Sequence, residues 1–413
     1  MLLVVFSSVI CIVFLDVFAW WQTSKIWQQA QDLQSLQTKA ADDTRKHYEV
    51  INDLKDKGVP SSRILPFKHM IRLNDQLNGG AYVPLAGVSN ITTVFCNDVG
   101  KYEIYLSDQY GFRNPANIAQ RETVDIALIG DSFTHGHCVD EDATIPGVIR
   151  ETFPHTLNFG ITGSGPLAHL GKIKEYALPK RPKLVIWVHF EGNDLDDLNN
   201  EREVPALLAY LQKGYTKGLP GMQQAIDRDL MAMYSKLYSD EAIRHQKKKE
   251  RQGEQDSTYT ESLNFIKDLI RIRHLRSYLS LIFSFWQYSP HLDLYAEAMK
   301  AAKSEIEAVG GEMYFVYLPA WQRFKFGNVR SYHREDVLNI AKNLDLTIID
   351  VLPEFERHKE PLSLFPYGFK RHYNEQGYKI VGDAIVDKII KDEPLALKLI
   401  IHLKGCVAFS LKR

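Results

Sequence analysis

From residue 124 onward, short apolar runs alternate with segments of helical pattern. An apolar run without polar alternation is typical of a strand buried on both faces, and a helix between successive runs makes the strands parallel. The pattern therefore predicts an α/β domain with three layers, in which helices cover both faces of a parallel sheet. The predicted strands are Val124–Ile129, Thr156–Phe159, Leu184–Phe190, Met313–Leu318 and Leu346–Ile349, and the helices between them include Ile145–Phe153, Leu167–Ala177, Leu292–Val309 and Arg334–Leu344.

The other segments differ from this domain, which we place at residues 121–392. Residues 58–120 are rich in Gly, Pro, Asn and Asp, and predict a loop-rich lead-in with a hairpin or two. Residues 195–290 form a helical insertion between the third and fourth strands, suited to a lid or a wall of a cleft. Its basic run His245–Arg251 is expected to be a solvated helix face, with contact to a membrane surface or an anionic glycan as the alternative.

The first 21 residues are almost wholly apolar and end in aromatic residues, which predicts a transmembrane anchor. A cleaved signal peptide is the alternative, but no small-residue cleavage site stands out near Ala19. A helical stalk with one apolar stripe is expected at residues 22–57. The body is expected outside the cytoplasm, although the basic residues after the apolar run favour the opposite orientation. The tail, residues 393–413, is expected to pack on the body or at a membrane surface.

Charge and cysteine content narrow the classes of partner. The chain has 50 basic and 51 acidic residues, so no bulk positive field would attract nucleic acid. Cys96 and Cys138 are the only cysteines in the body. In an oxidising compartment they could form a disulfide, with two free thiols as the equal alternative.

Four candidate site residues follow strands of the predicted sheet or precede its last helix. Ser132 and Gly163 follow the first and second strands, Asn193 follows the third, and His372 precedes the final helix. Each has a plain structural explanation, since Ser caps helices and Gly and Asn are common in turns. Together, however, they supply a nucleophile, oxyanion donors and a general base at one edge of the sheet.

These segments resemble the SGNH hydrolases, also called the GDSL esterase and lipase superfamily, in a membrane-anchored bacterial form. The resemblance rests on Gly-Asp-Ser-Phe at 130–133, Asn-Phe-Gly-Ile-Thr-Gly at 158–163, Glu-Gly-Asn-Asp at 191–194 and His-Tyr-Asn at 372–374. It implies a flavodoxin-like fold in which Ser132 is the nucleophile and His372 the base. The backbone N–H groups of Ser132 and Gly163 and the Asn193 amide would bind the oxyanion.

The chain departs from the family at the acid that orients the histidine. The family has Asp three residues before the His, where this chain has Phe369. Either His372 is oriented by a backbone carbonyl, or a carboxylate arrives from elsewhere, for which Asp350 after the fifth strand is the candidate.

Two further histidines follow Ser132, with three acidic residues close behind. These are His135, His137, Asp140, Glu141 and Asp142. Their spacing matches no metal-ligand pattern, so we expect solvated loop residues and neither a metal nor a cofactor.

The expected activity is hydrolysis of O-acyl esters, mainly acetyl esters of envelope glycans or small molecules, and a cleft built by the insertion would also suit long-chain lipids. An O-acyltransferase that uses the same serine with a separate acyltransferase partner is the first alternative. A non-catalytic scaffold that binds glycans is the second, and the absent family Asp is the feature that favours it.

Overall fold

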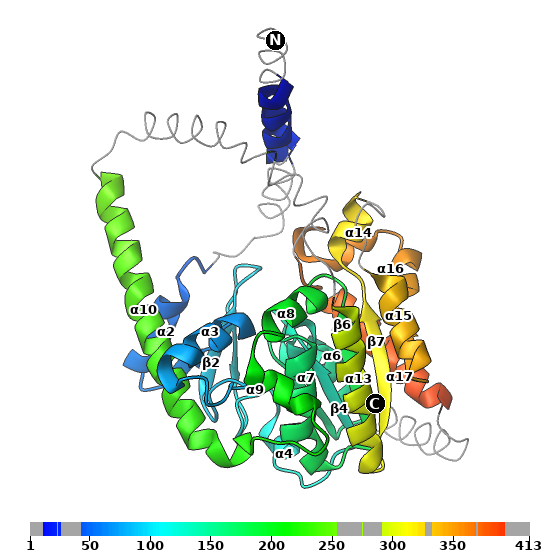
Figure 1. The fold of residues 1–413 in the computed structure, drawn as a ribbon. Coiled ribbons are helices and arrows are strands. Elements are labelled where there is room, and N and C mark those ends of the chain that lie inside the picture. The colour runs from blue at the N-terminus through cyan, green and yellow to red at the C-terminus, as the bar shows by residue number, and fades with distance from the viewer. Residues whose placement is uncertain are drawn as a thin grey trace, which may run out of the picture.

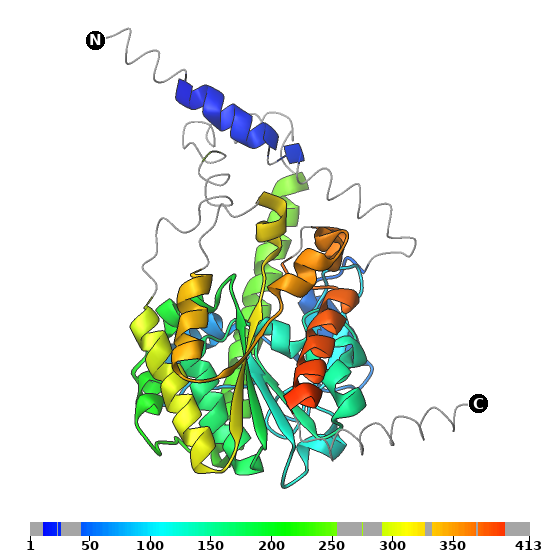
Figure 2. The same cartoon turned by 90° about the vertical axis from the view of Figure 1, so that its right-hand side faces the viewer.

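The computed structural model describes residues 11–22, 24–25, 43–253, 275, 291–326, 333–368 and 371–392. A five-stranded parallel sheet has the strand order β5-β4-β6-β7-β8. It lies at the centre of the main domain (Figures 1 and 2). The predicted parallel α/β sheet is confirmed, and its strands match the five apolar runs. The bounds are β4 Ile126–Gly130, β5 Thr156–Gly160, β6 Leu184–Phe190, β7 Glu312–Leu318 and β8 Thr347–Asp350.

The apolar runs form strands because both sheet faces are covered. In β4, Ala127 and Ile129 belong to one hydrophobic core, while Ile126 and Leu128 belong to the other. Strand β5 lies on one side of β4 and β6 on the other, so the chain reverses its direction of travel across the sheet here. The carboxyl end of β4 is therefore a topological switch point, where α/β proteins place their sites.

Two layers of helices cover the sheet, as Figure 2 shows edge-on. One core contains residues of α7 Pro166–Lys172, α13 Leu292–Ala308 and α15 Arg334–Asn343. The other contains residues of α6 Ile145–Thr152, α16 Leu352–Arg357 and α17 Glu375–Asp392. The helices expected between the strands are thus present.

The lead-in segment folds into a second, small sheet beside the main domain. Strands β2 Thr92–Cys96 and β3 Glu103–Leu106 pair antiparallel, and β1 Ser61–Arg63 adds to β2 in parallel. The lead-in also contains the helices α3 Phe67–Asn78 and α4 Ala116–Ala119. Helix α2 His47–Asp56 comes from the end of the predicted stalk, and its Val50 and Ile51 pack with Val94 of β2.

A buried arginine joins the lead-in to the main domain. The Arg113 guanidinium pairs with Glu103 at 2.7 Å and donates to the carbonyl oxygens of Gly136 and Val139 at 2.8 and 3.0 Å. Those carbonyls belong to the loop that follows Ser132. The lead-in therefore fixes the conformation of a loop at the switch point.

The described part of the insertion contains α8 Asp194–Glu201, α9 Pro205–Leu208 and α10 Gln223–Gly253. The first half of α10 packs on the lead-in, where Tyr82 donates to Asp229 at 2.6 Å and Ser89 donates to Asp227. Its far half extends beyond the body, as Figure 1 shows. The rest of the predicted lid, apart from residue 275, lies outside the described residues.

Residues 11–22 are helical. Within the described part of the chain, no helix has both the length and the apolar character that a bilayer span requires. The predicted anchor covers residues 1–21, of which 1–10 lie outside the described residues. Half of the predicted stalk, at residues 23 and 26–42, and the tail at 393–413 lie outside them as well, whereas the end of the stalk forms α2.

Candidate active site

Ser132 stands at the carboxyl end of β4 as the first residue of the short helix α5 Ser132–His135. The Asp131 side chain caps this helix by accepting from the Phe133 N–H at 2.9 Å. Glycine is required at position 130, because a Cβ there would lie 2.1 Å from Thr134 Oγ1. The sharp turn from strand to helix brings the Ser132 hydroxyl to the edge of the sheet, where the residue is 5% exposed.

His372 contacts Ser132, although the two residues lie near opposite ends of the domain in the sequence. Its Nε2 lies 2.8 Å from Ser132 Oγ, although 240 residues separate the two. The neighbouring Tyr373 is buried and donates its hydroxyl hydrogen to the Pro319 carbonyl at 2.6 Å, and Asn374 caps α17 by accepting from the Gly377 N–H at 3.0 Å. These two contacts hold the segment that carries His372.

Burial lowers the pKa of His372 well below its usual value, and the nearby His137 lowers it further. The imidazole is therefore neutral at neutral pH. A neutral Nε2 at hydrogen-bond distance from a hydroxyl can accept its proton.

Gly163 lies in the turn after β5 with a φ of +71°, a conformation that glycine adopts without strain. The next residue, Ser164, donates to the Gly130 carbonyl at 3.2 Å, so this turn is attached to the strand that carries Ser132. Among the described residues, none accepts a hydrogen bond from the Gly163 N–H. A donor in that state suits an oxyanion site, and the role stays a prediction.

Asn193 follows β6 and directs its amide toward two carboxylates. Its Nδ2 donates to Asp197 Oδ2 at 2.5 Å. Burial raises the pKa of Asp131, and a hydrogen bond from Asn193 opposes that shift. The amide thus lies beside the residue that precedes Ser132. Its predicted role as an oxyanion donor requires one of these hydrogen bonds to be exchanged.

The structure does not bring Asp350 to His372, which corrects the candidate for the acid. Asp350 ends the edge strand β8, where its carboxylate pairs with Arg334 and accepts from the Leu352 N–H. The family's acid position, Phe369, lies outside the described residues. The carboxylate that faces His372 Nδ1 is Asp98, with Oδ2 at 4.0 Å.

Asp98 comes from the loop after β2 in the lead-in, and sequence reasoning missed it. The same Oδ2 lies 3.4 Å from His137 Nε2. The only signal in the sequence was the proposed pairing of Cys96 with Cys138, which joins the segment before Asp98 to the one that contains His137.

His135 and His137 are not solvated loop residues, contrary to the expectation. His135 is fully buried, stacks on Phe95 with ring centroids 4.0 Å apart, and lies 2.8 Å from the Tyr105 hydroxyl. The His137 side chain is 16% exposed and its ring stacks on that of His372, with centroids 3.7 Å apart. Both are held because the lead-in covers the loop after Ser132.

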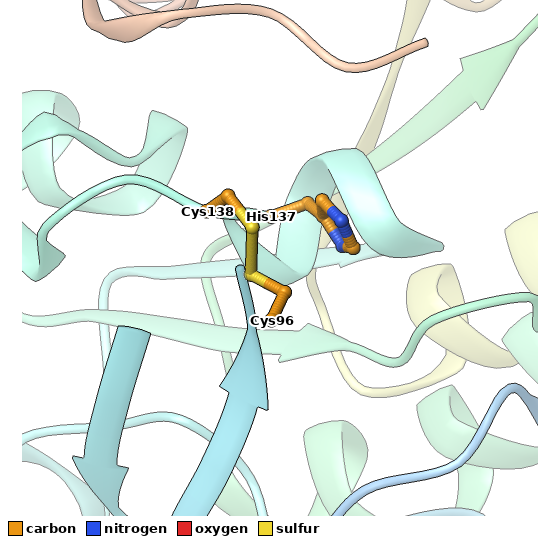
Figure 3. A group of neighbouring side chains, drawn as sticks. All are labelled: Cys96, His137 and Cys138. Atoms are coloured by element: carbon orange, nitrogen blue, oxygen red, sulfur yellow. A yellow bond between two sulfur atoms is a disulfide. The ribbon is translucent and has the colours of Figure 1, made fainter. Parts of the chain in front are cut away.

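Cys96 and Cys138 form a disulfide, with a Cα–Cα distance of 5.6 Å and His137 beside it (Figure 3). The bond closes a separation of 42 residues. In the chain-entropy description, a loop of that length contributes about 3–4 kcal/mol to the free energy of unfolding. Replacing both cysteines with serine should lower that free energy by about this amount in chemical denaturation, and a Cys11→Ser variant should not. Equal stability of the double variant and the parent would contradict the prediction.

Two sets of side chains in this region have ligand atoms close enough for a metal ion. One set is Asp98, His137 and His372, and the other is Cys96, His137 and Cys138. In the second set, the two cysteine sulfurs are bonded to each other in the disulfide, so they are not available as thiolate ligands. In the first set, His372 already contacts Ser132 through Nε2.

A buried lysine donates hydrogen bonds to two turns beside the site. Lys172 is fully buried, and its Nζ donates to the Gly130 carbonyl at 2.7 Å and to Ser164 Oγ at 2.8 Å. It therefore joins the turn before Ser132 to the turn that contains Gly163. Burial lowers the pKa of Lys172 to about 7, while the charges of Glu201 and Asp131 act in the opposite direction.

Comparison with known proteins gives the following similarities. No family model matches the chain, and no curated protein matches it. Among solved structures, a lipase/acylhydrolase from Enterococcus faecalis is 11% identical, covers 65% of this chain and 95% of its own, and has a TM-score of 0.36. A GDSL-like lipase from Bacteroides thetaiotaomicron VPI-5482 is 11% identical, with coverage of 68% and 92% and a TM-score of 0.34. A variant of an acetyl-xylooligosaccharide esterase from Geobacillus stearmophilus is 13% identical, with coverage of 65% and 95% and a TM-score of 0.35. Similarity at this level assigns neither a family nor an activity to this chain.

Proposed function

We propose that this chain is a serine ester hydrolase of the SGNH type. The observation that carries the proposal is the 2.8 Å contact between His372 Nε2 and Ser132 Oγ at the switch point of the sheet. A hydroxyl paired with a neutral imidazole is the arrangement that acyl transfer through a serine requires. The Ser132 and Gly163 N–H groups and the Asn193 amide are the proposed oxyanion donors.

In this mechanism Ser132 Oγ attacks the ester carbonyl while His372 Nε2 takes the hydroxyl proton. The imidazolium returns that proton to the leaving alkoxide as the carbon–oxygen bond breaks, which leaves an acyl-serine. Water then attacks the acyl-serine with His372 again as base, and the carboxylic acid and the free serine are restored.

A small acyl group, namely acetyl, is the substrate we favour. Ser132 is only 5% exposed, and Phe133 packs beside His372 with ring centroids 5.0 Å apart. Such a closely surrounded nucleophile suits a short acyl chain better than a long one. The disulfide favours an oxidising compartment, and so supports a location outside the cytoplasm. For that location we propose an O-acetylated glycan of the cell envelope as the substrate, reached from a membrane anchor.

The test is hydrolysis of p-nitrophenyl acetate, butyrate and octanoate by the purified chain, with His372→Ala as the inactive comparison. The proposal expects hydrolysis that is fastest for acetate and lost in the variant. A folded parent that hydrolyses none of the esters above the background rate would contradict it. Fastest hydrolysis of octanoate would retain the serine mechanism and overturn the acetyl assignment.

The pH dependence of kcat/KM should follow the His372 imidazole. Because burial lowers the pKa of His372, the base is already deprotonated at neutral pH. The rate should therefore fall below pH 6.5, where the His372 imidazole gains a proton. Discontinuous assays of kcat/KM from pH 4.5 to 8 would show this fall, and a half-maximal kcat/KM above pH 6.5 would contradict the prediction.

A further inference from the structure

We propose that Asp98 is the carboxylate that positions His372, and that His137 holds Asp98 in place. Asp98 belongs to the lead-in and not to the segment beside the histidine. The inference rests on the proposed function. It identifies the group that the chain uses in place of the acid absent near His372.

The requirement for such a group follows from the two ring nitrogens. His372 Nε2 faces Ser132 and must be unprotonated to accept the hydroxyl proton. The hydrogen of the neutral ring then lies on Nδ1, which needs an acceptor to fix that tautomer and the ring plane. Asp98 Oδ2 lies 4.0 Å from Nδ1, which is within ion-pair distance, and contacts of this kind commonly shorten when substrate binds.

His137 ties the Asp98 carboxylate to the segment that carries the nucleophile. Its Nε2 lies 3.4 Å from Asp98 Oδ2, and its ring lies nearly parallel to that of His372, with an interplanar angle of 23°. Its backbone N–H donates to the Ser132 carbonyl at 3.2 Å. One residue therefore contacts the proposed acid, the base and the nucleophile.

The disulfide restrains both members of this pair. Cys96 stands two residues before Asp98, and Cys138 directly follows His137, as Figure 3 shows for the His137 side. The lead-in is further attached by the Arg113 contacts to Gly136 and Val139, which flank the same loop. The carboxylate is thus held by covalent and buried polar links, although it is remote from His372 in sequence.

The charges near His372 make the effect of Asp98 measurable through the pKa of His372. Burial, His137 and Arg371 all lower the pKa of His372, and Asp98 raises it. Removing the Asp98 charge should therefore lower that pKa further, while it also withdraws the group that stabilises the imidazolium formed in the reaction.

The test compares Asp98→Asn with Asp140→Asn, which removes an exposed carboxylate that pairs with Lys101 in the neighbouring loop. For p-nitrophenyl acetate, Asp98→Asn should lower kcat by about 10²–10⁴-fold with little change in KM. Its acid limb in kcat/KM should move to lower pH. Asp98→Glu should recover part of the rate, and Asp140→Asn should behave as the parent.

The outcomes separate the inference from the function on which it rests. An active parent with an inactive Ser132→Ala variant, but with Asp98→Asn equal to Asp140→Asn in rate and pH profile, would overturn the inference alone. Loss of parental activity in EDTA with recovery on adding Zn²⁺ would also overturn it, because Asp98, His137 and His372 would then be metal ligands. A folded parent inactive on every ester would instead count against the function.

Discussion

Replacing Ser132 with alanine is expected to lower kcat/KM for p-nitrophenyl acetate by at least about 10³-fold. The variant keeps the fold, because the hydroxyl is a small group whose contacts are His372 Nε2 at 2.8 Å and Asp131 Oδ2 at 3.2 Å. It removes the only atom that forms the acyl-enzyme. The oxyanion donors remain, so a residual rate above the background is expected.

Ser239→Ala is the matched control for this change. Ser239 lies on the exposed part of α10, where its hydroxyl donates to the Ser235 carbonyl at 3.0 Å. This variant should keep the parental rate. A Ser132→Ala chain that is folded by circular dichroism and retains more than about a tenth of the parental kcat/KM would show that another group attacks the ester.

Replacing Lys172 with methionine is expected to lower the free energy of unfolding by about 3 kcal/mol and to lower kcat as well. Methionine fills a similar volume but removes a buried ammonium that donates to the Gly130 carbonyl and to Ser164. Asp131 and Glu201 are buried carboxylates whose ionised forms this cation favours. Without it, the ionised forms of these carboxylates lose a favourable charge, and the two turns that flank the site lose a shared donor.

Lys183→Met is the control for the lysine change. Lys183 pairs with Asp125 at 2.8 Å, but its side chain is 81% exposed, and exposed ion pairs contribute at most about 1 kcal/mol. Chemical denaturation of the two variants should therefore give clearly different midpoints. Equal midpoints would mean that the buried lysine contributes no more than a solvated one.

The fold was predictable because the five strands are buried on both faces. A run such as 184–190 is apolar at nearly every position, since β6 lies in the middle of the sheet between β4 and β7. The helices between the runs then required parallel strands. The small sheet of the lead-in was harder to predict from the sequence. Its strands β2 and β3 are short, and they are held by long-range contacts such as that of Arg113 with Glu103.

The site was predictable only where its residues end elements of the sheet or begin a helix. Ser132 and His372 do so, and the structure brings them together. Asp350 also ends a strand, but β8 is at the edge of the sheet, and Arg334 from the adjacent helix takes its carboxylate. Asp98 follows no strand of the main sheet, so its position depends on how the lead-in docks. That docking is a tertiary property with no periodic signal in the sequence.

The most direct measurement is mass spectrometry of the purified chain after treatment with a fluorophosphonate, a probe that reacts with serines activated by a base. We expect a single adduct on the peptide that contains Ser132, absent in Ser132→Ala and formed far more slowly in His372→Ala. A folded chain that forms no adduct, or forms it on a different serine, would contradict the assignment of Ser132 and His372 as nucleophile and base.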